Sequence, residues 1–164
     1  MDIIELQIKD ALETIPGKAK AENWKYDSLW TRAVKQVLVD IGRANSYQTA
    51  ANGCDNDNNG EWLYDIVWYQ YDRAGHITDV PLVAECEWGN RDAVQADFEK
   101  LLVSRAKYRV MVFQSGTDDN IYNIIRNMKL GIHKFSRTSI GDRYLLIGWA
   151  TDHWVFDQYV IHSK

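Results

Sequence analysis

Two glutamates and one aspartate have the types and spacing that indicate chemistry in this sequence. Glu85 and Glu87 stand two positions apart in the run VPLVAECEWGN. In a β-strand this spacing directs both side chains to one face, about 7 Å apart along the backbone. Asp65 lies in the earlier run EWLYDIVWYQ, which is rich in aromatic and β-branched residues and alternates as a strand does. Turn residues at 72–75 predict an antiparallel hairpin that pairs Asp65 with a residue at or next to Glu85.

Three carboxylates on one patch of a sheet repel one another unless a positive charge lies among them. A divalent cation is the economical answer, because Asp and Glu oxygens suit Mg²⁺ or Mn²⁺ better than a soft metal. The alternative is structural, since glutamates are common on the wet face of an edge strand and Pro81 hints at an edge. Val83 shares the face of the two glutamates, however, so full exposure of that face is not expected. We predict a metal site formed by Asp65, Glu85 and Glu87.

A calcium loop is a second metal interpretation. Asp55, Asp57, Asn59 and Gly60 fall at positions 1, 3, 5 and 6 of an EF-hand loop. The twelfth position, which requires a bidentate Glu, is Ile66, and the residues that follow do not predict a helix. We therefore interpret this stretch as a turn, in which Asn, Asp and Gly provide left-handed backbone.

The elements that must position the acids follow from the apolar pattern, and they predict an α/β fold with a mixed central β-sheet flanked by helices. The expected order is a helix from Ile4 to Ile15 broken by Pro16-Gly17, a helix from an Asp27 or Ser28 cap to Gly42, strands at about 61–71 and 77–88, a helix capped by Asn90 or Asp92, a strand at 107–113, a helix at about 119–130, and a hairpin of YLLIGW with WVFDQYV. We expect a single domain over residues 1–164, because no linker, repeat or low-complexity tract divides the chain.

Composition narrows the class of protein. An apolar content of 46% is ample for a packed core. No apolar run reaches the 18 residues of a membrane span, and the N-terminus is charged throughout, so a cytoplasmic protein without a membrane partner is expected. Neither the cysteines nor the histidines have metal-ligand spacing.

The net charge of −4 argues against a protein that coats nucleic acid by bulk attraction, but the charge is unevenly spread. One stretch near the C-terminus is basic apart from Asp142. It contains Arg126, Lys129, Lys134, Arg137 and Arg143. This stretch could hold phosphates, although a solvated surface is the simpler explanation of any one of these residues.

The order of elements and acids resembles the core of the PD-(D/E)XK nuclease superfamily, the restriction-endonuclease-like fold. The likeness covers roughly Ile3 to Phe113 and includes the helix DFEKLLVSRAKY and the strand RVMVF. Asp65 matches the motif Asp, Glu85 matches the second acid, and Glu87 stands at the position usually held by Lys. The resemblance implies a core of the order α-α-β-β-α-β-α-β-β and a Mg²⁺-dependent phosphodiesterase that hydrolyses DNA.

Glu87 is a departure from this pattern. Some nucleases of this fold carry Glu there and remain active, and in others a Lys from the following helix takes over, for which Lys100 is the candidate. Helical geometry counts against Lys100, because it lies about 200° around the helix from Phe98. Gln95 and Glu99 lie closer to the face that packs on the sheet.

The two leading helices offer further candidates. Members of this fold sometimes supply an extra Glu from that region, and Glu5 and Glu13 both qualify. A phosphate backbone could be steered by the basic residues of the second helix. These are Arg32, Lys35 and Arg43.

The leading hypothesis is a metal-dependent DNA nuclease in which Asp65 and Glu85 bind Mg²⁺ or Mn²⁺, and Glu87 adds a ligand or orients the water. A homodimer is expected by analogy alone, since cutting both strands often takes two sites. A second hypothesis is a catalytically inactive module of the same fold that binds a protein or nucleic-acid partner. Glycoside hydrolysis by the pair Glu85 and Asp65 ranks third, because nothing else in the sequence predicts a long sugar cleft.

Overall fold

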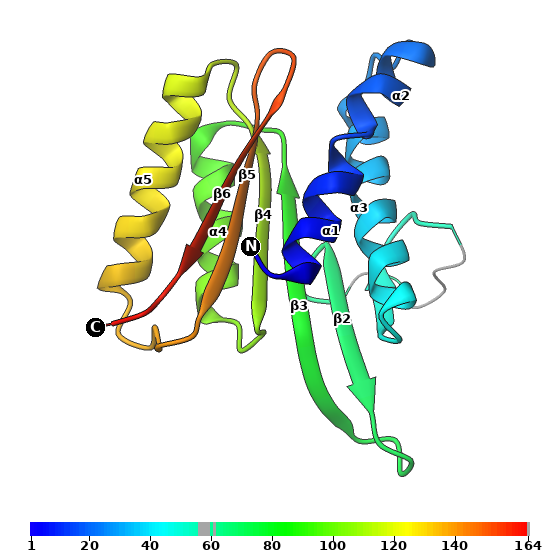
Figure 1. Cartoon of the computed structure of the whole chain (residues 1–164), viewed down its shortest axis with the longest axis vertical. Coiled ribbons are helices and arrows are strands. Elements are labelled where there is room, and N and C mark those ends of the chain that lie inside the picture. Colours follow the sequence, from blue (N-terminus) through cyan, green and yellow to red (C-terminus); the bar gives the residue numbers. More distant parts are fainter. Residues whose placement is uncertain (56–59, 61, 164) are drawn as a thin grey trace. The chain divides into compact units, whose positions relative to one another are not determined.

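The computed structural model describes residues 1–55, 60 and 62–163, and the chain divides into two compact units, Met1–Val83 and Ala84–Lys164. The fold is α/β, as predicted. Six strands form a mixed open sheet whose order follows the sequence from β1 to β6, and helices flank it (Figure 1). In this order β3 lies between two other strands, so Pro81 is not on an edge strand. The expected single domain over residues 1–164 stays a prediction.

The first unit holds the leading helices and the first strands. These are α1 (Ile3–Leu12), α2 (Ile15–Ala21), α3 (Asp27–Ala44), β1 (Gln48–Ala51), β2 (Ile66–Tyr71) and the part of β3 (Ile77–Glu87) that ends at Val83. The expected helix from Ile4 to Ile15 is too long, because α1 ends at Leu12. Pro16 does not break a helix but occupies the first turn of α2, where its missing N–H is harmless. The expected Asp27 or Ser28 cap of α3 is wrong, because the residue at the N-cap is Tyr26.

The core of the first unit lies where α3 meets β1 and β2. Trp68 is fully buried, and its Nε1 donates a hydrogen bond to the carbonyl oxygen of Leu38 at 3.0 Å. The ring of Tyr47 stacks on Trp68 with the centroids 5.5 Å apart. Gly42 leaves room for this indole, because a Cβ there would lie 2.7 Å from Trp68 Nε1. A large aromatic side chain therefore fixes the helix against the strands through both packing and a polar contact.

Two strand predictions in the first unit need correction. β1 was not expected, and it pairs antiparallel with β2 from Gln48 opposite Tyr69 to Ala51 opposite Ile66. The expected strand from about residue 61 is interrupted, because Leu63 adopts a left-handed backbone with φ of 65° and β2 begins only at Ile66. Asp65 therefore lies directly before the strand and not on it.

The second unit contains the rest of β3 followed by alternating helices and strands. These are α4 (Arg91–Val103), β4 (Tyr108–Gln114), α5 (Asp118–Lys134), β5 (Arg143–Trp149) and β6 (Trp154–Val160). Asn90 caps α4, as predicted, by accepting hydrogen bonds from the amides of Asp92 and Ala93. β4 and β5 are parallel, with Tyr108 opposite Arg143 and Gln114 opposite Trp149, whereas β5 and β6 form the predicted antiparallel hairpin.

Both helices of the second unit cover one face of its strands. Phe98 on α4 lies 6.4 Å from the ring of Tyr144, and a Cβ on Gly148 would collide with Ile121 of α5. Tyr144 and Gly148 are four residues apart on β5, so their side-chain directions share a face. Figure 1 shows the two helices side by side, in agreement with their mutual contacts. No helix in the described part of the chain is long and apolar enough to cross a membrane.

Candidate functional site

Glu85 and Lys100 form an ion pair in the second unit, and this pair is the contact there most relevant to catalysis. Glu85 lies on β3 and its residue is only 2% exposed. The Nζ atom of Lys100 lies 3.3 Å from Glu85 Oε1 and 2.7 Å from Asp97 Oδ1. Asp97 stands three residues before Lys100 on α4, so one turn of the helix sets the lysine beside both acids.

The pKa of Lys100 is raised above its ordinary value, first by the hydrogen bond from its ammonium group to Asp97 and then by the charge and hydrogen bond of Glu85. Lys100 is therefore a cation over the whole range in which enzymes are usually assayed. It cannot accept a proton as a general base. Its chemical capacity is to stabilise negative charge close to the Glu85 carboxylate.

The other predicted polar residues of this region make local contacts. Glu87 is half-buried, and its Oε1 accepts a hydrogen bond from the amide of Gly89 at 2.6 Å, which secures the turn after β3. Gln95 and Glu99 are exposed on α4 and bond to each other, from Nε2 to Oε1, at 2.9 Å. Asp97 was not predicted, although an acid three residues before a lysine in a predicted helix is a recognisable signal.

Asp65 is paired with a lysine in the first unit. Its Oδ1 lies 3.3 Å from the Nζ atom of Lys35, which projects from α3. Lys35 was expected to steer a phosphate backbone, but it is only 5% exposed and faces Asp65. A buried ammonium group needs such an anionic partner, because burial otherwise disfavours its charge.

The two candidate glutamates of the leading helices, Glu5 and Glu13, differ in burial. Glu5 is 1% exposed, and its Oε2 accepts a hydrogen bond from the amide of Asp2, which closes a capping box at the start of α1. Glu13 is exposed and pairs with Lys9 at 2.6 Å. Glu5 is thus the acid of the two that lies inside the unit.

Both arginines that were expected to steer phosphate are engaged with Asp55. Arg32 forms an ion pair with its Oδ1 at 2.6 Å, and Arg43 donates to its carbonyl oxygen at 3.1 Å. Asp57 and Asn59, which belonged to the calcium-loop interpretation and to the turn that we preferred, lie outside the described residues. The ion pair of Asp55 accounts for the one acid of this stretch that can be placed.

The chain matches no protein-family model, no curated protein and no solved structure. The resemblance to the PD-(D/E)XK nucleases therefore stays a prediction.

The expected metal site also stays a prediction. Within residues 1–55, 60 and 62–163, no group of three or more His, Cys, Asp or Glu side chains is arranged to hold a metal ion. The donor type still fits, because the Glu85 carboxylate is a hard oxygen ligand of the class that Mg²⁺ and Mn²⁺ prefer.

Proposed function

We propose that this protein is a metal-dependent nuclease that hydrolyses phosphodiester bonds of DNA. The observation that carries the proposal is the contact of 3.3 Å between Lys100 on α4 and the buried Glu85 on β3. In this pair a carboxylate of the type that holds a hard metal ion lies beside a cation that could stabilise charge on a phosphoryl oxygen. On β3, Glu87 stands where the family that this chain resembles usually has Lys. The lysine near Glu85 comes from α4 instead and is Lys100.

Lys100 would act on the transition state of the reaction. Negative charge grows on the phosphoryl oxygens as water attacks, and a fixed ammonium group nearby stabilises that charge more than it stabilises the bound substrate. Asp97 keeps the ammonium group in place from the same helix. The role requires a permanent cation, and the raised pKa of Lys100, caused first by Asp97 and then by Glu85, supplies one.

In this proposal Glu85 and Glu87 are the residues of the second unit that would hold Mg²⁺ or Mn²⁺. When bound, the ion would supply an activated water and neutralise charge on the phosphate. Glu85 contributes an oxygen ligand beside a cation that balances its charge. Asp65 carries the same arrangement in the first unit, where Lys35 is its partner.

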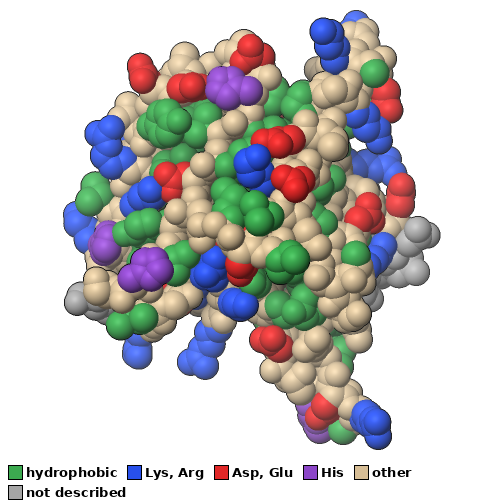
Figure 2. Space-filling view, viewed as in Figure 1, with side chains coloured by type: hydrophobic (Ala, Val, Ile, Leu, Met, Phe, Trp, Pro, Cys, Tyr) green, Lys and Arg blue, Asp and Glu red, His purple; other side chains and the backbone are tan. Residues whose placement is uncertain are grey.

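A basic surface on the second unit supports a polyanionic substrate. Arg126, Lys134 and Arg137 are exposed, on and just after α5. Figure 2 shows Lys and Arg side chains spread along the border where α5 lies. Lys129 contributes less, because it is paired with Asp157 at 2.7 Å. Such residues contact phosphates without reading sequence, so they predict affinity and not specificity.

A cleavage assay tests the proposal. Supercoiled plasmid and single-stranded DNA are incubated with Mg²⁺ or Mn²⁺ and with wild-type protein, Glu85→Gln, Lys100→Met or the control Lys20→Met, which alters an exposed lysine of α2. We expect cleavage by the wild type and the control and a loss in the other two. No cleavage by the wild type with either metal, or equal cleavage by all four proteins, contradicts the proposal.

A binding module without catalysis is the second candidate. The observation that favours it is that Glu87, at the position of the usual Lys, bonds to Gly89 and so has a structural role. Calorimetric titration with Mn²⁺ separates the two. Micromolar binding that Glu85→Ala abolishes favours the nuclease, whereas absence of binding favours the module.

A further inference from the structure

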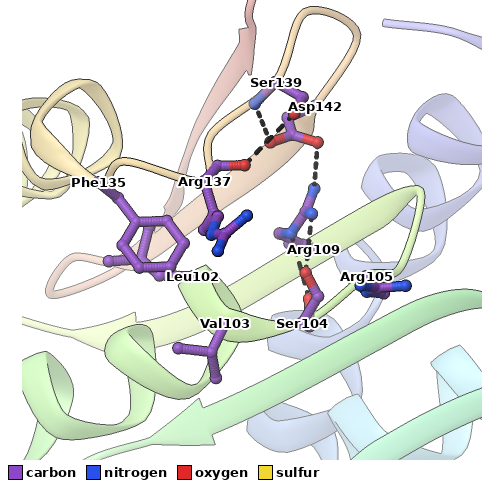
Figure 3. Close-up of a pocket in the computed structure, with 9 residues that line it drawn as sticks. All are labelled: Leu102, Val103, Ser104, Arg105, Arg109, Phe135, Arg137, Ser139 and Asp142. Atoms are coloured by element: carbon purple, nitrogen blue, oxygen red, sulfur yellow. Dashed lines mark hydrogen bonds and ion pairs between the residues drawn. The ribbon is translucent and has the colours of Figure 1, made fainter.

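A pocket of about 680 Å³ opens in the second unit, and none of Glu85, Glu87, Asp97 and Lys100 lines it. It lies where the end of α4 meets the start of β4 and the loop after α5 (Figure 3). Its lining includes three arginines, Arg105, Arg109 and Arg137, against one acid, Asp142. The volume falls within the range of small-molecule sites, and the excess of positive charge indicates an anionic ligand.

Arg109 forms the fixed part of this pocket. It is only 4% exposed, and its Nε and Nη2 donate to the hydroxyl and carbonyl oxygens of Ser104 at 3.1 and 3.0 Å. Its Nη1 lies 3.3 Å from Asp142 Oδ1, and its guanidinium carbon lies 5.0 Å from the centroid of the Tyr144 ring. A guanidinium group held from so many directions provides a preorganised positive charge.

Asp142 does not cancel the charge of the other two arginines. Its Oδ1 contacts Arg109, and its Oδ2 accepts a hydrogen bond from the amide of Ser139 at 2.9 Å, which shapes the loop. Arg105 and Arg137 are exposed, and within the described part of the chain neither takes part in an ion pair. These two side chains are therefore able to close on an anion from solvent.

One wall of the pocket is apolar. Leu102 and Phe135 form it, and Figure 3 shows the Arg137 side chain between Phe135 and Arg109. An inorganic anion would leave this wall in water. A ligand that carries both a phosphate and a flat ring would cover it, because an aromatic side chain offers a surface on which a base stacks.

We propose that the pocket binds a nucleoside phosphate, with the phosphate between the exposed Arg105 and Arg137, the buried charge of Arg109 behind them, and the base against Phe135. The forked guanidinium groups match phosphate oxygens, and the aromatic ring supplies the contact that separates a nucleotide from a free anion. This site does not depend on the nuclease proposal, since neither Glu85 nor Lys100 lines it. The same chemistry occurs in a free mononucleotide and at the phosphorylated end of a nucleic acid.

Calorimetric titration of the full chain tests the site with defined probes. These are adenosine monophosphate, adenosine, inorganic phosphate, and a tetranucleotide with and without a 5′-phosphate. We expect adenosine and inorganic phosphate each to bind about tenfold more weakly than adenosine monophosphate, or worse. Whichever of adenosine monophosphate and the 5′-phosphorylated tetranucleotide binds more tightly identifies the source of the phosphate.

Variants locate the binding. Arg105→Gln and Arg137→Gln alter exposed residues and should each weaken adenosine monophosphate binding about tenfold, whereas the control Arg91→Gln, at the exposed start of α4, should not. Phe135→Leu should weaken the nucleotide but not inorganic phosphate, and a thermal melt checks that each variant folds. Lys100→Met should leave nucleotide binding intact even where it abolishes DNA cleavage.

Three results would overturn the proposal. The first is no heat with either phosphorylated probe at millimolar concentration. The second is nucleotide binding that Arg105→Gln and Arg137→Gln leave unchanged. The third is inorganic phosphate that binds as tightly as adenosine monophosphate, since the apolar wall would then contribute nothing.

Discussion

The ammonium group of Lys100 lies 3.3 Å from Oε1 of Glu85, although Lys100 stands about 200° around α4 from the buried Phe98. The side chain bridges this angular offset because its four methylene groups extend far from the helix axis. The side chain is 49% exposed, and its nitrogen still reaches the buried acid. Helical angles describe Cα directions, and for lysine they understate what the charged end can reach.

Replacement of Lys100 should separate catalysis from folding. We expect Lys100→Met to lower the cleavage rate constant about 100-fold or more, because a charge that stabilises the transition state is lost. The stability should also fall, by up to about 3 kcal/mol, because the substitution leaves the Glu85 carboxylate, whose side chain is 3% exposed, without its cation. Single-turnover cleavage and urea denaturation measure the two effects. A loss of activity no larger than the loss of folded protein would indicate a structural role alone.

Gly42→Ala should destabilise the first unit in spite of the better helix propensity of alanine. The new Cβ would lie 2.7 Å from Trp68 Nε1 and 2.9 Å from Thr49 Cγ2, so the indole that bonds to Leu38 must shift. Overpacking of this kind costs about 1–3 kcal/mol. Tryptophan fluorescence during urea unfolding reports the change.

Gly17→Ala is the matched control for that substitution. Gly17 also lies in a helix, and a Cβ there meets nothing within 4 Å. Its replacement should be neutral or stabilising by up to about 1 kcal/mol. Equal effects of the two substitutions would argue against the tight packing of α3 on Trp68.

Asp142→Asn should destabilise the second unit. The substitution leaves the guanidinium group of Arg109, which is 5% exposed in its side chain, without its carboxylate partner. Removal of one partner of a buried ion pair costs about 3–5 kcal/mol. Asp119→Asn, at an exposed position of α5, should cost less than about 1 kcal/mol. Chemical denaturation that gives similar values for both variants would count against Arg109 as a buried anchor.

His153 should titrate above the ordinary histidine pKa of 6.5, because a hydrogen bond to Asp152 and the nearby charge of Asp118 raise its pKa. A raised pKa in the folded state means that the contact stabilises the loop fully below the unfolded pKa, and that this effect is lost as pH rises through the folded value. Proton NMR titration of the imidazole measures the midpoint. Asp152→Asn should lower it, and a midpoint at or below 6.5 in the wild type would contradict the contact.

The regular part of the fold was predictable because its patterns are strong. The apolar run of β4, the cap at Asn90 and the hairpin of β5 with β6 all follow from local residue types. β1 was missed because Gln48–Ala51 is only four residues long and Thr49 is its one residue of a type enriched in strands. The late start of β2 was missed because the left-handed backbone at Leu63 is unusual for a residue with a branched side chain.

The acidic residues of the candidate site could be predicted from the sequence, but the lysines that pair with them could not. Alternation along β3 and the shared face with Val83 predicted that Glu85 would not be fully exposed, and it is buried. The partners of the acids come from other elements, with Lys35 on α3 and Lys100 on α4, so no local pattern pairs them. The pocket around Arg109 was not predicted either, because its lining residues come from separate elements. An arginine inside an apolar strand is nevertheless an unusual signal.

Each unit balances its own acid with its own lysine, Asp65 with Lys35 and Glu85 with Lys100. The negative charges of Asp65 and Glu85 are therefore neutralised without a divalent ion. A chelator should strip such a protein of activity without unfolding it, and purification in the presence of one should still yield material that regains cleavage when Mn²⁺ is returned.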